Sequence, residues 1–198
     1  MRLFLRLTAM ILSVCTLMMI LPFSASAETE AGFEYTITDN KATITAYTGN
    51  DTAVTIPATL GGADVTVIGA GAFAANTTMQ SVTFPNTLKI IENSAFNACS
   101  ALTAVSFPES VETIETLSFY NCTALSDITL SPYTFDIGYH AFHNTNWYRN
   151  VDAGVVDLGR VLYSYAGTVP KDTVITVKYG TAAIAPYAFA NRTNLKGG

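Results

Sequence analysis

Residues 102–122 read LTAVSFPESVETIETLSFYNC, and this stretch contains the pattern that decides the fold. Its second phenylalanine belongs to a series that recurs every 23 residues, at Phe73, Phe96, Phe119 and Phe142. An isoleucine comes five residues before each of them, at Ile68, Ile91, Ile114 and Ile137. Because several apolar positions keep the same step, the sequence predicts a solenoid of 23-residue coils in which equivalent side chains stack.

The spacing within one coil predicts short strands separated by tight turns. Val105 and Phe107 alternate with polar residues, so both are expected on the buried face of a strand that ends at Pro108. Val111 and Ile114 are expected to return the chain along the other side of the coil. A single coil cannot bury these side chains, whereas a stack can. The predicted fold class is therefore a mostly β repeat solenoid.

Two segments carry a resemblance to a known repeat family. Residues 107–114 (FPESVETI) and 95–102 (AFNACSAL) resemble the repeat of BspA-type, or Treponema-type, leucine-rich-repeat proteins of bacterial surfaces and secretions. The resemblance implies a right-handed stack with short helical turns, an N-terminal β cap and an inserted β-hairpin. It also implies an extracellular interaction role. Residues 131–134 (SPYT) depart from the repeat because the proline comes one place late, and a locally irregular strand pair is expected there.

The N-terminus has the features of a secretory signal peptide. Arg2 and Arg6 precede an apolar stretch at residues 7–23, and Ala25-Ser26-Ala27 forms a cleavage site of the A-x-A kind. We therefore assign residues 1–27 to a signal peptide. The alternative is a membrane anchor, since the apolar run approaches spanning length. The cleavage site favours the signal peptide, so the mature chain is expected to be secreted or on the cell surface, with no membrane span.

The rest of the chain is expected to divide into a cap and a stack. We assign residues 28–64 to the N-terminal β cap and residues 65–198 to the leucine-rich-repeat solenoid. A hairpin insertion is expected at residues 147–172, and the apolar series then resumes at Ile175, Val177, Ile184, Phe189 and Leu195. Because the final coil lacks its next strand, we expect a chain truncated in the last repeat, or another chain that covers this end.

Composition excludes some classes of partner. The 198 residues carry a net charge of −5, and loss of residues 1–27 removes two more arginines. Only 13% of the residues are charged. An acidic surface of this kind repels nucleic acid and anionic lipid, so neither is expected as a partner.

Two groups of residues are candidates for ligand binding. The outward positions of the repeated strand would form one sheet face, and repeat proteins generally bind through such a surface. The predicted hairpin carries aromatic residues that would serve as anchors if they protrude. The alternative is that these aromatics pack the hairpin onto the solenoid. The candidates are Ser81, Thr83, Ala104, Ser106, Asp127, Thr129, Trp147, Tyr163 and Tyr165.

The sequence does not indicate a catalytic or metal centre. His140 and His143 have the spacing of half a metal site, but no third ligand is evident and their positions look variable and exposed. Cys99 and Cys122 occupy equivalent places in adjacent coils, so they either form a disulfide or, as we favour, a ladder of small buried residues. No cofactor, no metal and no enzymatic activity are expected.

The sequence thus favours a binding or structural function over a catalytic one. We expect an exported macromolecular binding module of the adhesion type, with an extracellular protein or glycan as ligand. The alternative is a passive spacer or targeting domain within a larger surface protein or enzyme.

Overall fold

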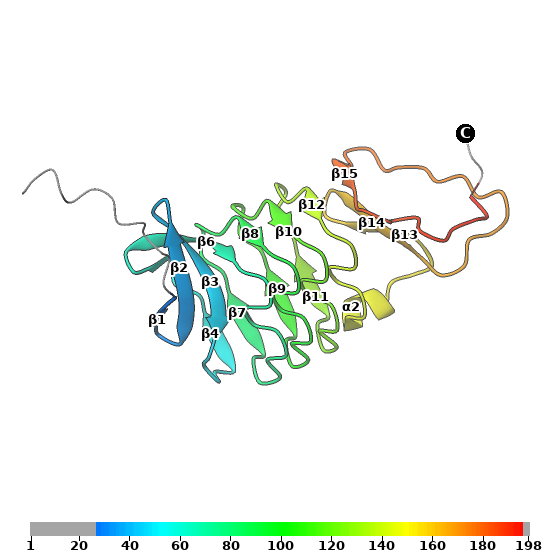
Figure 1. Cartoon of the computed structure of the whole chain (residues 1–198). Helices are drawn as coiled ribbons and strands as arrows, with labels where there is room; N and C mark the ends of the chain where they lie inside the picture. The colour runs from blue at the N-terminus through cyan, green and yellow to red at the C-terminus, as the bar shows by residue number, and fades with distance from the viewer. Residues whose placement is uncertain (1–26, 196–198) are drawn as a thin grey trace, which may run out of the picture.

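The computed structural model describes residues 27–195, which form an elongated stack of coils with little helix (Figure 1). The fold is a mostly β solenoid of about six coils, as the 23-residue period predicts. The expected signal peptide, residues 1–27, lies outside the described residues except for Ala27. Within residues 27–195, no helix has the length and apolar character needed to cross a membrane.

One side of the stack is an eight-stranded sheet. Its first strands pair antiparallel, and from β3 onward each strand of the main path joins the next in parallel, one strand per coil. The order is β1 (Glu28–Glu30), β2 (Phe33–Thr38), β3 (Lys41–Tyr47), β6 (Ala63–Ile68), β8 (Ile90–Ile91), β10 (Thr113–Ile114) and β12 (Asp136–Ile137), with β5 (Thr59–Leu60) on β6.

The opposite side is a four-stranded parallel sheet made from the V-x-F strands of the repeat. It consists of β4 (Ala53–Thr55), β7 (Ser81–Thr83), β9 (Ala104–Ser106) and β11 (Asp127–Thr129). In β7 and β9 the middle valine is buried and its two neighbours are exposed, which is the alternation expected for a strand with one face on the core.

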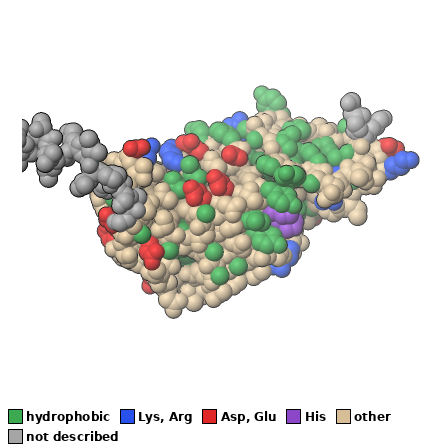
Figure 2. Space-filling view, in the orientation of Figure 1, with side chains coloured by type: hydrophobic (Ala, Val, Ile, Leu, Met, Phe, Trp, Pro, Cys, Tyr) green, Lys and Arg blue, Asp and Glu red, His purple; other side chains and the backbone are tan. Residues whose placement is uncertain are grey.

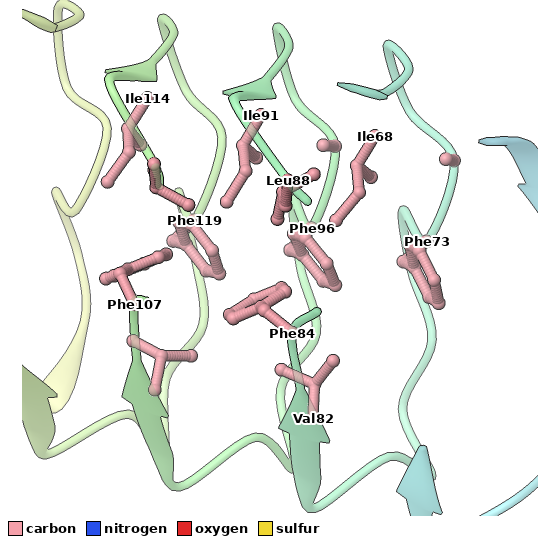
Figure 3. Packing of buried hydrophobic residues seen from close by; sticks show 14 of the residues in the cluster. Ile68, Phe73, Val82, Phe84, Leu88, Ile91, Phe96, Phe107, Ile114 and Phe119 are labelled. Carbon is pink, nitrogen blue, oxygen red and sulfur yellow. The ribbon is translucent and has the colours of Figure 1, made fainter. Parts of the chain in front are cut away.

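A column of phenylalanine rings fills the space between the two sheets. The rings of Phe73 and Phe96 stack with centroids 4.7 Å apart, those of Phe96 and Phe119 are 4.9 Å apart, and those of Phe119 and Phe142 are 5.3 Å apart. Figure 3 shows three of these rings in line, with Phe84 and Phe107 in a second row beside them. The equivalent apolar side chains of successive coils therefore form the core, as the repeat predicts.

The two described cysteines are free and form a polar ladder. The thiol of Cys99 donates to the carbonyl oxygen of Phe73, and the thiol of Cys122 donates to that of Phe96, both at 3.1 Å. The neighbouring Cys99 thiol and burial raise the pKa of Cys122. The favoured alternative, a column of small buried residues without a disulfide, is therefore the one that the structure shows.

The irregular segment at residues 131–134 keeps its register. Strand β12 pairs with β10 in the same phase as the earlier coils, with Ile114 beside Ile137. Thr134 takes the buried place that Val111 holds one coil earlier, and its hydroxyl donates to the carbonyl oxygen of Val111 at 2.8 Å. This hydrogen bond satisfies the buried hydroxyl and keeps the coil in line, so the expected irregularity of the strand pair does not occur.

After β12 the chain forms a helical turn and a hairpin. Helix α2 (Asn146–Arg149) leads to β13 (Gly154–Leu158) and β14 (Val161–Ala166), which pair antiparallel. Strand β15 (Ala183–Ile184) then adds to β14 in parallel. The hairpin thus provides a strand between the coil of β12 and that of β15.

The last described coil differs from the prediction. Residues 174–180 form no strand, and Val177 and Ile184 are 46% and 51% exposed although their spacing places them in phase with the core. Among the described residues no later coil packs on them, which explains their exposure. The boundary between cap and solenoid remains a prediction.

Candidate binding surface

The outward residues of the four-stranded sheet form a flat surface with few chemical features. Ser81, Ala104 and Asp127 lie side by side on neighbouring strands, and Ser106 lies beside Thr129, with Thr83 at the equivalent place on β7. All six side chains are exposed, as the alternation predicts. They are small, so this sheet face offers hydrogen bonds but no large apolar anchor.

The hairpin aromatics do not protrude from the solenoid. Tyr163 and Tyr165 are only 5% and 8% exposed, and Trp147 is half-buried in α2 beside Tyr163 and Phe142. The hydroxyl of Tyr163 accepts a hydrogen bond from the backbone N–H of Phe142 at 2.8 Å. In earlier coils that N–H is bonded to a carbonyl oxygen of the next coil, so the tyrosine replaces a missing backbone partner. Tyr163 and Tyr165 therefore pack the hairpin onto the solenoid, which is the alternative that the sequence left open for the hairpin aromatics.

Two other aromatic residues, next to β12, are exposed. Tyr133 is 53% exposed and Phe135 is 41% exposed, and with Glu109, Glu112 and Asp136 they line a shallow groove on the coil edge. We refer to these five residues as the acidic-aromatic edge. Two aromatic rings beside carboxylates can offer apolar contact and attract a positive charge at the same place.

The irregular repeat explains why these rings are exposed. Tyr133 lies in the phase of Ser110, and Phe135 lies in the phase of Glu112 and Lys89. Glu112 and Lys89 are exposed and Ser110 is partly exposed, so these phases lie outside the core in the other coils and the aromatic rings have no place in it. Sequence reasoning missed both residues, although aromatics at outward phases of a repeat are the signal that would have found them.

Basic side chains touch this edge at two points. Lys89 forms a salt bridge with Glu112 at 2.8 Å, and both side chains are largely exposed, so the pair adds little stability. The guanidinium of Arg160, from the turn of the hairpin, lies 5.6 Å from the ring centre of Phe135. Within residues 27–195, Glu109 and Asp136 form no salt bridge.

Charge is divided unequally along the stack. Residues 27–146 contain twelve acidic and two basic residues, whereas residues 147–195 contain three acidic and five basic residues. Figure 2 shows acidic side chains mainly over the N-terminal half of this face and the histidines in the C-terminal half. The first part of the molecule is therefore suited to a basic partner and the second part to an acidic one.

His140 and His143 lie against each other, and both are half-buried instead of exposed. Their ring centroids are 4.1 Å apart. Burial lowers the pKa of both side chains, and the positive charge of His143 contributes to the shift at His140. Among the described residues, no three His, Cys, Asp or Glu side chains come together as a set that could hold a metal ion.

Comparison with known proteins places the fold in a family. The family model described as "BspA type Leucine rich repeat region" matches residues 45–165 in six copies. No curated protein matches the chain.

Solved structures of bacterial leucine-rich-repeat proteins are similar to this chain. The Treponema pallidum leucine-rich-repeat protein is 28% identical with a TM-score of 0.53, over 56% of this chain and 53% of that protein. A leucine-rich-repeat protein from Bacteroides capillosus is 30% identical with a TM-score of 0.56, over 62% of this chain and 94% of that protein. One from Bacteroides ovatus is 24% identical with a TM-score of 0.59, over 85% of this chain and 40% of that protein, and shows the fold alone.

The chain spans about half of the T. pallidum protein and two fifths of the B. ovatus protein. The in-phase phenylalanine column, the two parallel sheets and the six matched copies of the repeat agree with one another. The chain belongs to the family of BspA-type leucine-rich-repeat proteins.

Proposed function

We propose that this chain is an exported protein-binding module of the adhesion type, which acts at the cell surface or outside the cell. Its contact surface is the acidic-aromatic edge, and its partner is an extracellular protein with exposed Lys or Arg side chains. The observation that carries this proposal is the exposure of Tyr133 and Phe135 next to the carboxylates of Glu109 and Asp136. Leucine-rich repeats generally serve as protein-binding modules, which supports the class of function.

The composition of the acidic-aromatic edge makes it a better candidate for the contact surface than the sheet face. Aromatic residues dominate the binding energy of protein interfaces, whereas serine and threonine are under-represented among the residues that matter most. The sheet face consists of small side chains such as Thr83 and Ser106, and each of them can make only a few contacts with a partner protein. Carboxylates around exposed rings also accelerate association with a basic surface, because opposite charges steer the encounter.

A second candidate function is a spacer or targeting domain within a larger surface protein. The coverage of the T. pallidum and B. ovatus relatives favours it, because this chain matches only part of their length. A stack of coils that share one continuous core forms a stiff connector, and it needs no ligand of its own. Under this alternative the acidic-aromatic edge has no binding partner.

Binding assays with matched variants test the proposal. Purified chain is measured against immobilised extracellular matrix proteins at concentrations up to about 10 μM, a range that detects affinities typical of transient interfaces. The double variant Tyr133→Ser, Phe135→Gln gives these positions polar side chains like those of the regular coils. We expect it to bind at least about tenfold more weakly, because two hot-spot residues are lost.

The matched control is Thr83→Ala, Ser106→Ala, which alters the sheet face and leaves the edge intact. We expect it to bind as the unchanged chain does. A loss of binding in this control, with no loss in the edge variant, would transfer the function to the sheet face. Absence of binding to every matrix protein tested would favour the spacer.

A further inference from the structure

A pocket lies where the last regular coil meets the hairpin and the following loop. It has a volume of about 290 Å³ and lies between residues 139–143, helix α2, strand β14 and residues 186–192. Its walls include Tyr139, His140, His143, Tyr148, Tyr187 and Arg192. We call it the histidine pocket. It is separate from the acidic-aromatic edge, and no residue lines both.

Aromatic rings hold one another in place along the walls. The ring centroids of Tyr139 and His140 are 3.6 Å apart in a stacked arrangement, and those of His143 and Tyr148 are 4.5 Å apart. Tyr187 meets the ring of Tyr139 edge-on at 4.9 Å and is 71% exposed. The Tyr187 ring therefore keeps most of its surface free, while its neighbours are fixed by packing.

Arg192 provides a fixed positive charge at the same place. Its two terminal nitrogens donate to the carbonyl oxygens of Gly167 and Tyr165 at 3.0 and 2.7 Å. Its Nε–H is buried and has no hydrogen-bond partner among residues 27–195. Arg192 lines the pocket, so its positive charge is placed to attract a negatively charged ligand there.

The remaining polar groups suit a ligand that carries hydroxyl groups. The hydroxyls of Ser164 and Tyr148 share a hydrogen bond of 2.8 Å at the pocket wall. Burial lowers the pKa of His140 and His143 and so favours the neutral ring, which has one donor and one acceptor nitrogen. Among the described residues, no Asp or Glu lines this pocket.

We propose that the histidine pocket binds an acidic sugar, a pyranose ring that carries a carboxylate. The apolar face of the sugar packs on Tyr187 and Tyr139, its hydroxyls bond to the two histidines and Ser164, and its carboxylate lies toward Arg192. Aromatic walls with a few polar groups are typical of small-ligand sites, and arginine is the preferred partner of carboxylates. The small volume limits the occupant to about one ring.

The proposal goes beyond protein binding at the acidic-aromatic edge and does not depend on it. Most of the pocket lining comes from residues 148–192, in the part of the molecule in which basic residues outnumber acidic ones, and among the described residues no carboxylate lines the pocket to repel the ligand. An acidic peptide would be attracted by the same arginine. The sugar is favoured because exposed aromatic rings and imidazole nitrogens recognise a ring with an apolar C–H face and several hydroxyls better than a single flexible carboxylate side chain.

Proton NMR gives a direct test, because the chain has only two histidines and both line the pocket. The untagged chain is titrated with 3′-sialyllactose, with a glucuronate disaccharide, with lactose and with an acidic peptide of similar size. We expect saturable shifts of the histidine C2–H signals with at least one acidic sugar, at dissociation constants in the millimolar range or tighter. Lactose and the peptide should bind at least about tenfold more weakly.

Two tyrosine variants separate the pocket from the rest of the surface. Tyr187→Ala removes an exposed stacking surface without opening the core, and we expect about threefold to tenfold weaker binding of the acidic sugar. Tyr179→Ala is the control, because Tyr179 is also an exposed tyrosine but does not line this pocket. It should bind as the unchanged chain does.

Three results would overturn the proposal. The first is that neither acidic sugar shifts the histidine signals at about 10 mM, well above the affinity expected of such a site. The second is that lactose or the peptide binds as tightly as the acidic sugar. The third is that Tyr187→Ala, with an unchanged circular dichroism spectrum, has no effect. Protein binding at the edge is measured separately, so its outcome does not decide this one.

Discussion

The ring of Phe119 lies parallel to that of Phe96, with an angle of 4° between the planes and 4.9 Å between the centroids. Phe142 continues the same stack on the other side of Phe119 at 5.3 Å. Each ring therefore contacts an equivalent ring in the coil above or below. This relation joins the coils into one core and keeps the surface residues of successive coils in register.

Replacement of Phe119 tests the importance of this column. Phe119 is fully buried in mid-stack, so Phe119→Ala should lower the free energy of unfolding by about 3–5 kcal/mol, from lost burial and the cavity that remains. Urea unfolding followed by circular dichroism measures the change. Phe135→Ala is the control on an exposed phenylalanine, and it should cost less than about 1 kcal/mol. Equal costs for both variants would contradict a buried column.

Removal of one hydroxyl tests the role of Tyr163. Its oxygen accepts the N–H of Phe142, so Tyr163→Phe leaves a buried donor without a partner and should cost about 1–3 kcal/mol. Thermal and urea unfolding measure the loss. Tyr165→Phe serves as control and should be nearly neutral, because the Tyr165 hydroxyl forms no hydrogen bond with residues 27–195 and is not buried without a partner. A neutral Tyr163→Phe would mean that water replaces the hydroxyl.

Alkylation tests the state of the cysteines. Cys99 and Cys122 are buried and free, and burial together with the neighbouring thiol keeps the pKa of Cys122 raised. Both thiols should therefore resist iodoacetamide in the folded chain and react fully in urea without a reducing agent. Peptide mass spectrometry measures the extent of reaction at each residue. A peptide pair linked through Cys99 and Cys122 would instead show the disulfide.

The two histidines predict a pH dependence of stability. Burial holds the pKa of His140 and His143 below the ordinary 6.5 in the folded chain, so the unfolded chain takes up protons first as the pH falls. Their contribution to stability is complete above pH 6.5 and is lost as the pH falls from there toward the folded pKa values. The melting temperature should decline over this window, and NMR titration of the C2–H signals should give midpoints below 6.5. The double variant His140→Asn, His143→Asn should flatten this decline of the melting temperature. NMR midpoints above 6.5 for the two histidines would contradict the predicted pH dependence.

Periodicity alone predicts the regular part of the fold. Phe73 to Phe142 keep one step, and a repeated step has a single physical solution, a stack that buries the repeated side chain. The same reasoning placed the exposed strand positions such as Thr83 correctly, because alternation along a strand depends on local geometry only.

The residues that break the period could not be placed in this way. For Tyr163 the sequence left protrusion and packing open, because no other coil has an equivalent hairpin, and only the structure shows the Phe142 N–H that it satisfies. His140 and His143 looked exposed because other coils have unrelated residues there. They are half-buried because their rings pack against each other and because Tyr148, from helix α2, packs on His143, and such contacts leave no repeated pattern in the sequence.

Hydrogen exchange of the chain with and without a bound matrix protein tests the central claim most directly. The account predicts that the partner slows exchange at residues 109–116 and 131–137, which carry the acidic-aromatic edge, and leaves residues 81–83 and 104–106 unchanged. Protection of the strands β7, β9 and β11 with no change at the edge would contradict it and assign binding to the sheet face.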